Sequence, residues 1–369
     1  MPMRIAYVSL FFHPVVGGTE TIVLNLARRM VTFGHTVNVY TSLSTPNQPN
    51  FRGRLSKREQ FEGLNVYRSR EFLPMLFNHS FHGEDVVHLH SFGPLYFYVE
   101  SFRNKNRKLV STLHGEEIVS HGKLRNRLFG SKILDRSSRI IAQTDIEKAF
   151  IMDYYKIDGN KIAIIPPGVD DSCFKTAEKP SPDFVSRMQY GSGYILSLCR
   201  VVPQKRLEVA INAMKYLPSE IHYIIAGIIQ DRPTYNACMS LAAKLGIEKR
   251  IHFIGFVNEE LKKRLILNSE ALIVPGDETF SIASVEAMCQ GVPIVAANHL
   301  VLPSVIRDGV NGLLFDYMNS TSASNKLNYL LQNKAAAKSM GLRGRQMAWE
   351  NWRWDVVAKQ TEKLYLQLF

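Results

Sequence analysis

The chain alternates between short β-rich runs and segments of helical periodicity, and this alternation starts twice. In the first half, Val23, Leu26, Ala27 and Met30 follow the i, i+3, i+4, i+7 spacing of one helix face. Strands are expected around that helix and beyond it at residues 4–9, 36–40, 85–90, 108–113, 140–143 and 162–165. Strands that alternate with helices predict parallel sheets covered by helices, the α/β class.

A stretch rich in proline and charge, residues 175–183, is the best candidate for a linker. After it the pattern restarts, with a helix expected at 207–216 and strands at 194–198, 222–226, 251–254, 271–274, 294–297 and 312–315. A chain of 369 residues exceeds one ordinary core. We therefore expect two doubly wound, Rossmann-like domains, 1–178 and 185–345, with ligands bound in the cleft between them.

Composition narrows the class of protein. Apolar residues make up 46% and charged residues 21% of the chain, as in soluble globular proteins, and no apolar run is long enough to cross a bilayer. Residues 5–12 are interpreted as a first strand rather than a signal peptide, because no small-residue cleavage site follows. The four cysteines are far apart, which disfavours a disulfide framework or a zinc site and favours the cytoplasm.

The net charge of +12 is unevenly distributed. Residues 101–140 contain ten Lys and Arg against three Asp and Glu. Such a cluster attracts polyanions, including nucleic acid, anionic lipid headgroups and phosphorylated substrates. The alternative is a solvated basic face without a partner. No nucleic-acid-binding motif accompanies the charge.

Glu278 and Glu286, separated by seven residues, are the most informative pair in the sequence. A helical pattern starts at residue 282, which places Glu278 on the loop before a helix N-terminus and Glu286 about one turn inside. Free N–H groups at such an N-terminus attract phosphate. The pair therefore suits a nucleotide sugar, which has hydroxyls at both ends and a diphosphate between them. The alternative is two surface glutamates on an amphipathic helix.

Arg200 and Lys205 directly follow an apolar run and precede a helix, so both cations are expected at the carboxyl end of a strand. A diphosphate leaving group needs its charge neutralised by cations or by a metal. The sequence contains no Asp-x-Asp, no HExxH and no other dense cluster of metal ligands. We therefore expect the two side chains to neutralise the diphosphate without a metal, the alternative being an exposed basic loop.

Gly17 and Gly18 lie between the first strand and the first helix, where glycine lets the backbone approach a phosphate or sugar closely. The GxGxxG form of dehydrogenases is absent, and a flexible turn is the alternative. His114 ends a strand, in a position suited to polar contact with a substrate. His88 and His90 share one face of another strand, and a structural role is expected because no third metal ligand is evident.

These residues and several further runs resemble the retaining glycosyltransferases of group 1 (family 4), which have the GT-B fold. The similarity covers nearly the whole length. Its pieces lie at residues 4–6, 17–20, 27–35, 85–90, 112–115, 166–174, 200–205, 251–257, 278–295 and 308–314.

The resemblance implies a role for each candidate residue. Arg200 and Lys205 would bind the diphosphate, Glu286 the ribose and Glu278 the transferred sugar. The backbones of Phe280, Ser281 and Ile282 would complete the donor pocket, and the backbone of residues 255–257, which includes Val257, would lie near the base. Gly17 and Gly18 would close over the donor. His114 would contact the sugar near the reacting carbon.

The resemblance also implies a function. We expect a metal-independent, retaining hexosyltransferase that uses a nucleotide-diphosphate sugar as donor substrate, with no further cofactor, and an acceptor alcohol. Residues 346–369 would form a helix that returns to the first domain. A lipid-linked or glycan-precursor acceptor, and contact of residues 103–132 with an anionic membrane on its cytoplasmic face, are further hypotheses.

Three departures from the family pattern concern the donor pocket. Ser281 stands where glycine is common, Gly276 follows Pro275 where serine is usual, and Ser304 replaces a frequent glutamate. A GT-B epimerase, a phosphorylase and a non-catalytic sugar-binding module remain alternatives. A phosphorylase would need a lysine-bound pyridoxal phosphate.

Overall fold

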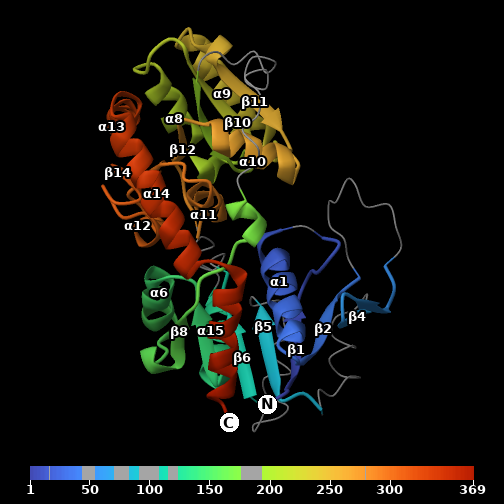
Figure 1. The fold of residues 1–369 in the computed structure, drawn as a ribbon. Coiled ribbons are helices and arrows are strands. Elements are labelled where there is room, and N and C mark those ends of the chain that lie inside the picture. The colour runs from blue at the N-terminus through green and yellow to red at the C-terminus, as the bar shows by residue number, and fades with distance from the viewer. Residues whose placement is uncertain are drawn as a thin grey trace. The chain divides into compact units, whose positions relative to one another are not determined.

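A computed structural model describes residues 1–15, 17–43, 55–69, 83–90, 108–114, 124–175, 193–278 and 280–369, with the side chains of 124–129 not described. The chain forms two compact units (Figure 1). Unit 1 comprises Met1–Gly168 and Trp354–Phe369, and unit 2 comprises Val169–Arg353. In the described residues, no helix is both long and apolar enough to cross a membrane.

Unit 1 is built on an eight-stranded sheet in the order β3-β4-β2-β1-β5-β6-β7-β8. All neighbouring strands are parallel except β3 and β4, which form an antiparallel edge pair. The strands are β1 (Arg4–Ser9), β2 (Thr36–Ser42), β3 (Arg58–Phe61), β4 (Leu64–Ser69), β5 (Val86–His90), β6 (Lys108–Thr112), β7 (Arg139–Ala142) and β8 (Ile162–Ile164). The helices are α1 (Gly18–Thr32), α5 (Leu124–Arg136), α6 (Asp145–Tyr155), the short 3₁₀ turn η1 (Gly159–Lys161) and α15 (Trp354–Leu366).

Unit 2 is built on a six-stranded, wholly parallel sheet in the order β11-β10-β9-β12-β13-β14. Its strands are β9 (Gly193–Leu198), β10 (Ile221–Ala226), β11 (Ile251–Gly255), β12 (Ala271–Val274), β13 (Ile294–Ala297) and β14 (Gly312–Phe315). Its α-helices are α8 (Leu207–Met214), α9 (Arg232–Lys244), α10 (Glu259–Asn268), α11 (Ile282–Cys289), α12 (Leu302–Val305), α13 (Ser320–Gln332) and α14 (Lys334–Asn351). Three 3₁₀ turns complete it: η2 (Asp171–Phe174), η3 (Pro203–Lys205) and η4 (Glu248–Arg250).

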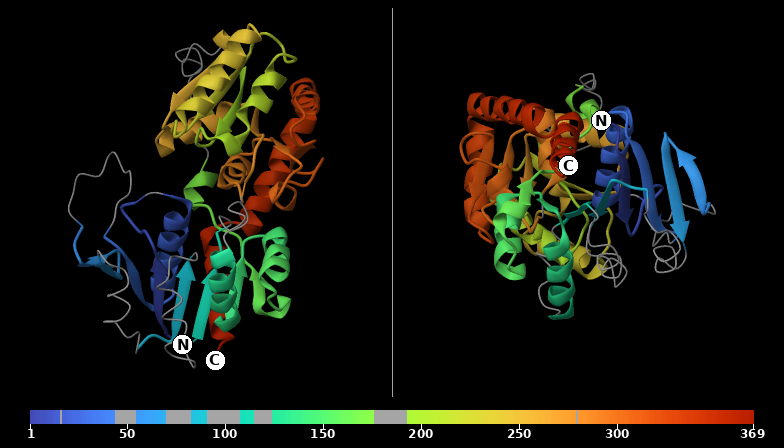
Figure 2. Two further views of the ribbon diagram at one scale, coloured as in Figure 1. Left: turned by 180° about the vertical axis from the view of Figure 1, so that it is seen from behind. Right: turned by 90° about the horizontal axis from the view of Figure 1, so that it is seen from below.

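Both sheets confirm the predicted α/β class, and each has a point at which the strand order reverses. In unit 1, β1 has β2 on one side and β5 on the other; in unit 2, β9 lies between β10 and β12. Helices pack on the sheets, with α5 and α6 against the β6–β8 side of unit 1 and α13 and α14 against the β13–β14 side of unit 2 (Figure 2). The β3–β4 hairpin was not predicted, because its edge strand is short and largely polar.

The C-terminal helix α15 belongs to unit 1, where it lies beside α1 (Figure 1). Its buried residues recur with helical spacing and give it one apolar face: Trp354, Val357, Ala358, Thr361, Leu364 and Tyr365. An ion pair from Arg29 to Asp355 at 3.2 Å and a hydrogen bond between His35 and Glu362 at 2.8 Å join α15 to the N-terminal part of the chain.

The chain crosses from unit 1 to unit 2 after Gly168, earlier than the boundary at residue 178 that we expected from the sequence. It returns to unit 1 at Trp354, later than the expected boundary at residue 346. Gly168 belongs to unit 1, but Val169 is already buried in the core of unit 2. On the return, α14 continues to Asn351, and Trp352 and Trp354 are buried in the cores of units 2 and 1 respectively. The burial of these apolar side chains sets the boundary, while most of the proline-rich stretch lies outside the described residues.

Helix α11, which carries Glu286, is held against α14 by a very close backbone approach. Gly341 of α14 faces Gly291, and a Cβ atom at Gly341 would lie 1.9 Å from the Gly291 carbonyl oxygen. One turn further, Gly344 packs on Met288. Glycine at position 341 therefore sets the distance between the two helices.

We predict that Gly341→Ala destabilises the protein by about 2 kcal/mol, because the added methyl group must push α11 and α14 apart. In an ordinary helix interior the same change stabilises by up to about 1 kcal/mol, so the sign is diagnostic. Urea unfolding measures the effect, with Leu342→Ala on the exposed side of the same helix as the control. A stabilising Gly341→Ala would contradict the close approach.

Candidate functional site

Two loops of unit 2 meet at the point where its strand order reverses. The loop that carries Arg200 and Lys205 follows β9, and the loop that carries Glu278 follows the neighbouring strand β12. Because β9 and β12 are parallel, both loops leave the same edge of the sheet. This is the place where open α/β sheets bind ligands.

Glycine at position 276 allows these two loops to touch. A Cβ atom there would lie 2.3 Å from the Gln204 carbonyl oxygen. The next residue donates its amide to that same carbonyl, Asp277 N to Gln204 O at 2.8 Å. The side chain of Lys205 donates back to the Asp277 carbonyl at 3.0 Å. The departure from Pro-Ser to Pro-Gly thus has a steric reason in this chain.

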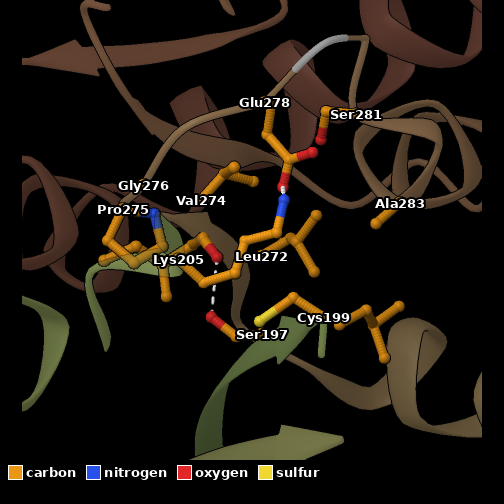
Figure 3. Close-up of a pocket in the computed structure, with 12 residues that line it drawn as sticks. Ser197, Cys199, Lys205, Leu272, Val274, Pro275, Gly276, Glu278, Ser281 and Ala283 are labelled. Carbon is orange, nitrogen blue, oxygen red and sulfur yellow. Dashed lines mark hydrogen bonds and ion pairs between the residues drawn. The ribbon is translucent and has the colours of Figure 1, made fainter. Parts of the chain in front are cut away.

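Lys205 and Glu278 form an ion pair at this junction. Lys205 Nζ lies 2.6 Å from Glu278 Oε1, and each side chain is only 17% exposed. Figure 3 shows both pointing into one pocket, which Cys199, Gly276 and Ser281 also line. An anion that entered the pocket would therefore meet the Lys205 ammonium, whose position is held by Glu278.

Ser281 begins helix α11 in a conformation that suits glycine. Its φ of 63° and ψ of 67° are left-handed, and its side chain is buried. For an L-residue this conformation costs roughly 1–2 kcal/mol. Its hydroxyl pairs with that of Ser284 at 2.7 Å, which satisfies the buried oxygen. Ser281 thus adopts a conformation that glycine reaches without steric cost, at the position where the resemblance led us to expect glycine.

The residues on either side of Ser281 contribute chiefly backbone. The Phe280 ring is buried and contacts the edge of Trp352, with ring centroids 6.2 Å apart. Ile282 is the first residue of α11 and packs against the core of unit 2. Amide groups in the first turn of a helix lack intrahelical partners and can bind an anion.

Glu286 lies inside α11 and is paired with a different lysine. Lys262 of α10 approaches Glu286 Oε1 at 2.6 Å, and the two side chains are 18% and 15% exposed. Burial raises the pKa of Glu286, and the Lys262 ammonium opposes that rise. The structure therefore gives each glutamate of the predicted pair its own lysine partner.

Arg200 lies on the same loop after β9 as Lys205, and Val257 lies after β11. Arg200 is exposed and donates from Nη1 to Gln230 Oε1 at 2.8 Å. Val257 follows β11 and is half-buried, next to Phe256, which is 69% exposed. Gly255 before them has a φ of 73°.

The candidates of unit 1 also follow strands. Gly17 precedes α1 in an extended conformation and Gly18 is the first residue of that helix, so neither needs a positive φ. His114 follows β6 and is buried. Its ring nitrogens contact Gln143 Nε2 and His90 Nδ1, both at 3.1 Å, and burial lowers the pKa of His114 to about 4.

His88 is fully enclosed, in line with the predicted structural role. Its two ring nitrogens contact Tyr365 Oη at 2.5 Å and Thr112 Oγ1 at 2.6 Å. Its ring centroid lies 4.2 Å from that of His90, so the two histidines share a face as predicted. Nothing in the described residues forms a group of three or more His, Cys, Asp or Glu side chains suited to a metal ion.

Sequence reasoning missed two partners of the candidate residues. Gln143 follows β7 as His114 follows the adjacent β6, so the rule that strand ends meet at one edge could have identified it. Lys262 had no such signal, because it lies within a charged helix. In the basic segment 103–132, residues 103–107 and 115–123 lie outside the described residues and the side chains of 124–129 are not described, so the contact of this segment with a membrane stays a prediction.

Comparisons with known proteins agree with this geometry. The model of Glycosyltransferase Family 4 matches residues 16–172, and that of Glycosyl transferases group 1 matches residues 183–347. The D-inositol 3-phosphate glycosyltransferase of Xylanimonas cellulosilytica is 25% identical over 413 aligned residues, 99% of this chain and 96% of that protein. The protein of the same name from Mycolicibacterium gilvum is 28% identical over 186 residues, 50% of this chain and 42% of that protein.

A solved structure shares the fold over nearly the whole chain. The crystal structure of Anabaena HepE in complex with UDP-glucose superposes with a TM-score of 0.82 at 18% identity, and the match covers 99% of this chain and 100% of HepE. With family models on both halves and two parallel-sheet α/β domains, the chain belongs to the group 1 glycosyltransferases of family 4 and has the GT-B fold.

Proposed function

We propose that this chain transfers a hexosyl group from a nucleotide-diphosphate sugar to an acceptor hydroxyl, with retention of anomeric configuration and without a metal ion. The observation that carries the proposal is the Lys205–Glu278 pair at the carboxyl ends of β9 and β12, beside the N-terminus of α11. It brings a cation for phosphate and an acceptor for sugar hydroxyls next to the N-terminus of a helix, which favours anions.

The diphosphate would lie against Lys205, Arg200 and the first turn of α11. A phosphate oxygen that reached Lys205 Nζ would compete with Glu278 for the same ammonium. Glu278 would then turn to the hydroxyls of the transferred sugar. These cations and the helix dipole would stabilise the negative charge that develops on the leaving diphosphate, a role that a metal ion has in other enzymes.

The nucleoside would extend toward Glu286 and β11. Glu286 would accept from the ribose hydroxyls, and the backbone of residues 255–257, Val257 included, would line the base. In unit 1, Gly17 and Gly18 would close over the donor and His114 would touch the sugar near the reacting carbon. The low pKa of His114 suits a neutral hydrogen-bonding role at that place.

The proposed chemistry is a same-face substitution. The bond from the anomeric carbon to the β-phosphate oxygen breaks, and the acceptor oxygen bonds to the same face of that carbon. The acceptor proton passes to the departing phosphate, which leaves as a nucleoside diphosphate. No side-chain base is then required, and the protein contributes position and charge.

We predict that a thermal-shift screen of UDP, GDP and ADP and their hexose derivatives will identify a stabilising ligand. UDP is the first choice, because the HepE structures hold UDP or UDP-glucose. Lys205→Met should weaken binding of that diphosphate about tenfold to a hundredfold, the usual worth of a hydrogen bond to a charged group. Lys215→Met, on an exposed site of the same unit, is the control.

Titration calorimetry of the folded variants measures the effect. Glu286→Ala should abolish the thermal stabilisation of the protein by that nucleotide. If no nucleotide stabilises the wild-type protein, or if Lys205→Met binds as tightly as Lys215→Met, the proposed donor site is wrong.

The acceptor is proposed to carry a phosphate, lipid-linked or free. The basic segment 103–132 supplies the matching charge, and two relatives are named for an inositol phosphate acceptor. The same segment would dock on an anionic membrane at its cytoplasmic face.

We predict that the protein binds liposomes containing anionic lipid and that Arg125→Ala with Arg127→Ala weakens this binding. Each basic residue near such a surface contributes about 1 kcal/mol, so the double variant should lose more than tenfold. Co-sedimentation measures it, with neutral liposomes and a Lys215→Ala, Lys244→Ala variant as controls. Binding that is indifferent to lipid charge or to the two arginines would contradict the docking hypothesis.

A further inference from the structure

Lys262 connects two carboxylates across two helices of unit 2. Its ammonium lies 2.6 Å from Glu286 Oε1 on α11 and 2.9 Å from Glu259 Oε1 on its own helix α10. Glu286 and Lys262 are largely buried, whereas Glu259 is 75% exposed. The contact of Lys262 with Glu286 is thus sheltered from solvent, whereas its contact with Glu259 is exposed.

The ionised form of Glu286 depends on this contact. Burial raises the pKa of the carboxyl, and the adjacent Lys262 ammonium is the largest influence that lowers it again. Conversely, Glu286 and Glu259 raise the pKa of Lys262 above its usual value although burial opposes them. Glu286 and Lys262 are therefore each other's charge partner, in contact at 2.6 Å.

The other groups that face Glu286 do not replace Lys262. Glu259 is an anion, and Lys263 donates to Ser172 Oγ at 2.9 Å. Two thiols also face the carboxyl, Cys173 from η2 and Cys289 further along α11. Burial raises the pKa of Cys173 to about 12 and that of Cys289 further, so both stay neutral.

We propose that Lys262 is a positioning residue for the nucleotide: it fixes Glu286 as a carboxylate through Oε1 and leaves Oε2 for the ribose hydroxyls. This inference rests on the proposed function, since it takes Glu286 as the ribose acceptor. An ionised carboxylate is a stronger acceptor than a neutral carboxyl. Loss of Lys262 would therefore weaken nucleotide binding although the lysine itself contacts no nucleotide.

The test compares Lys262→Met with Lys263→Met, a neighbouring lysine on the same helix. The nucleoside diphosphate selected by the thermal screen is titrated from about pH 5.5 to 8.5, where ligand phosphates change charge as well. The ratio of the variant Kd to the wild-type Kd is the readout, because the titration of the nucleotide cancels in it.

We expect Lys262→Met to raise Kd about tenfold at pH 7 and the ratio to grow as pH falls. The sign follows from linkage: without the ammonium the pKa of Glu286 rises further, so lowering the pH protonates it and removes the acceptor. Lys263→Met should give a ratio near one at every pH. Lys262→Arg, which keeps the charge, should restore most of the affinity.

A double variant keeps the test valid if Lys262→Met fails to fold around an unpaired buried carboxylate. In Lys262→Met, Glu286→Gln that carboxylate is absent, so the double variant should fold and bind no more weakly than Glu286→Gln alone. The inference is overturned if the Kd ratio of Lys262→Met equals that of Lys263→Met. It is also overturned if the double variant binds the nucleotide more weakly than Glu286→Gln alone. If wild-type protein binds no nucleotide, the proposed function fails and this inference fails with it.

Discussion

The candidate donor site depends on one electrostatic constraint: its two glutamates are largely withdrawn from water, and each faces a cation. Lys205 faces Glu278 between two loops, and Lys262 faces Glu286 between two helices. Removing a charge from water costs several kcal/mol unless a partner compensates. Fold and site are therefore coupled, because the same packing that withdraws the two carboxylates from water also brings the lysines to them.

The two pairs differ in what a ligand would do to them. Lys205 lines a small pocket at the loop junction, where a phosphate could take its ammonium and release Glu278 toward the sugar. Lys262 is held by two carboxylates, which suits a fixed support rather than an exchangeable contact. Buried ion pairs often contribute little to stability compared with apolar packing. The position of the Lys205–Glu278 pair at the ends of β9 and β12, and of Glu286 within α11 beside it, favours a role in binding.

Much of the fold was predictable because its signals are local. Every strand of the second sheet coincides with an apolar run in the sequence, and the glycine-rich and cationic loops lie at strand ends, as the alternation predicted. The short β3–β4 hairpin was missed because it is mostly polar. The passage between units was misplaced because Val169 and Phe174 are buried by tertiary packing, which a search for proline and charge does not detect.

The site was predictable only in part, for the same reason. Glu278, Lys205 and Glu286 could be named from spacing and strand ends, but their pairing depends on which helices pack together. Lys262 looks like any charged residue of α10 until α11 is placed beside it. Ser281 was identified from the sequence only as a departure from glycine, and the structure shows that it adopts the left-handed conformation itself. The need for glycine at position 276 comes from the close approach of the Gln204 carbonyl, which belongs to a loop about seventy residues earlier in the chain.

The most direct test of this division of roles is calorimetric titration of a nucleoside diphosphate and its sugar derivative against wild type, Glu278→Gln and Glu286→Gln. Glu278→Gln should lose affinity for the sugar derivative by about tenfold while it binds the bare diphosphate at least as well, because Lys205 is freed. Glu286→Gln should weaken both ligands. The central claim would be contradicted if Glu278→Gln weakened both ligands equally, or if Glu286→Gln bound both as the wild type does.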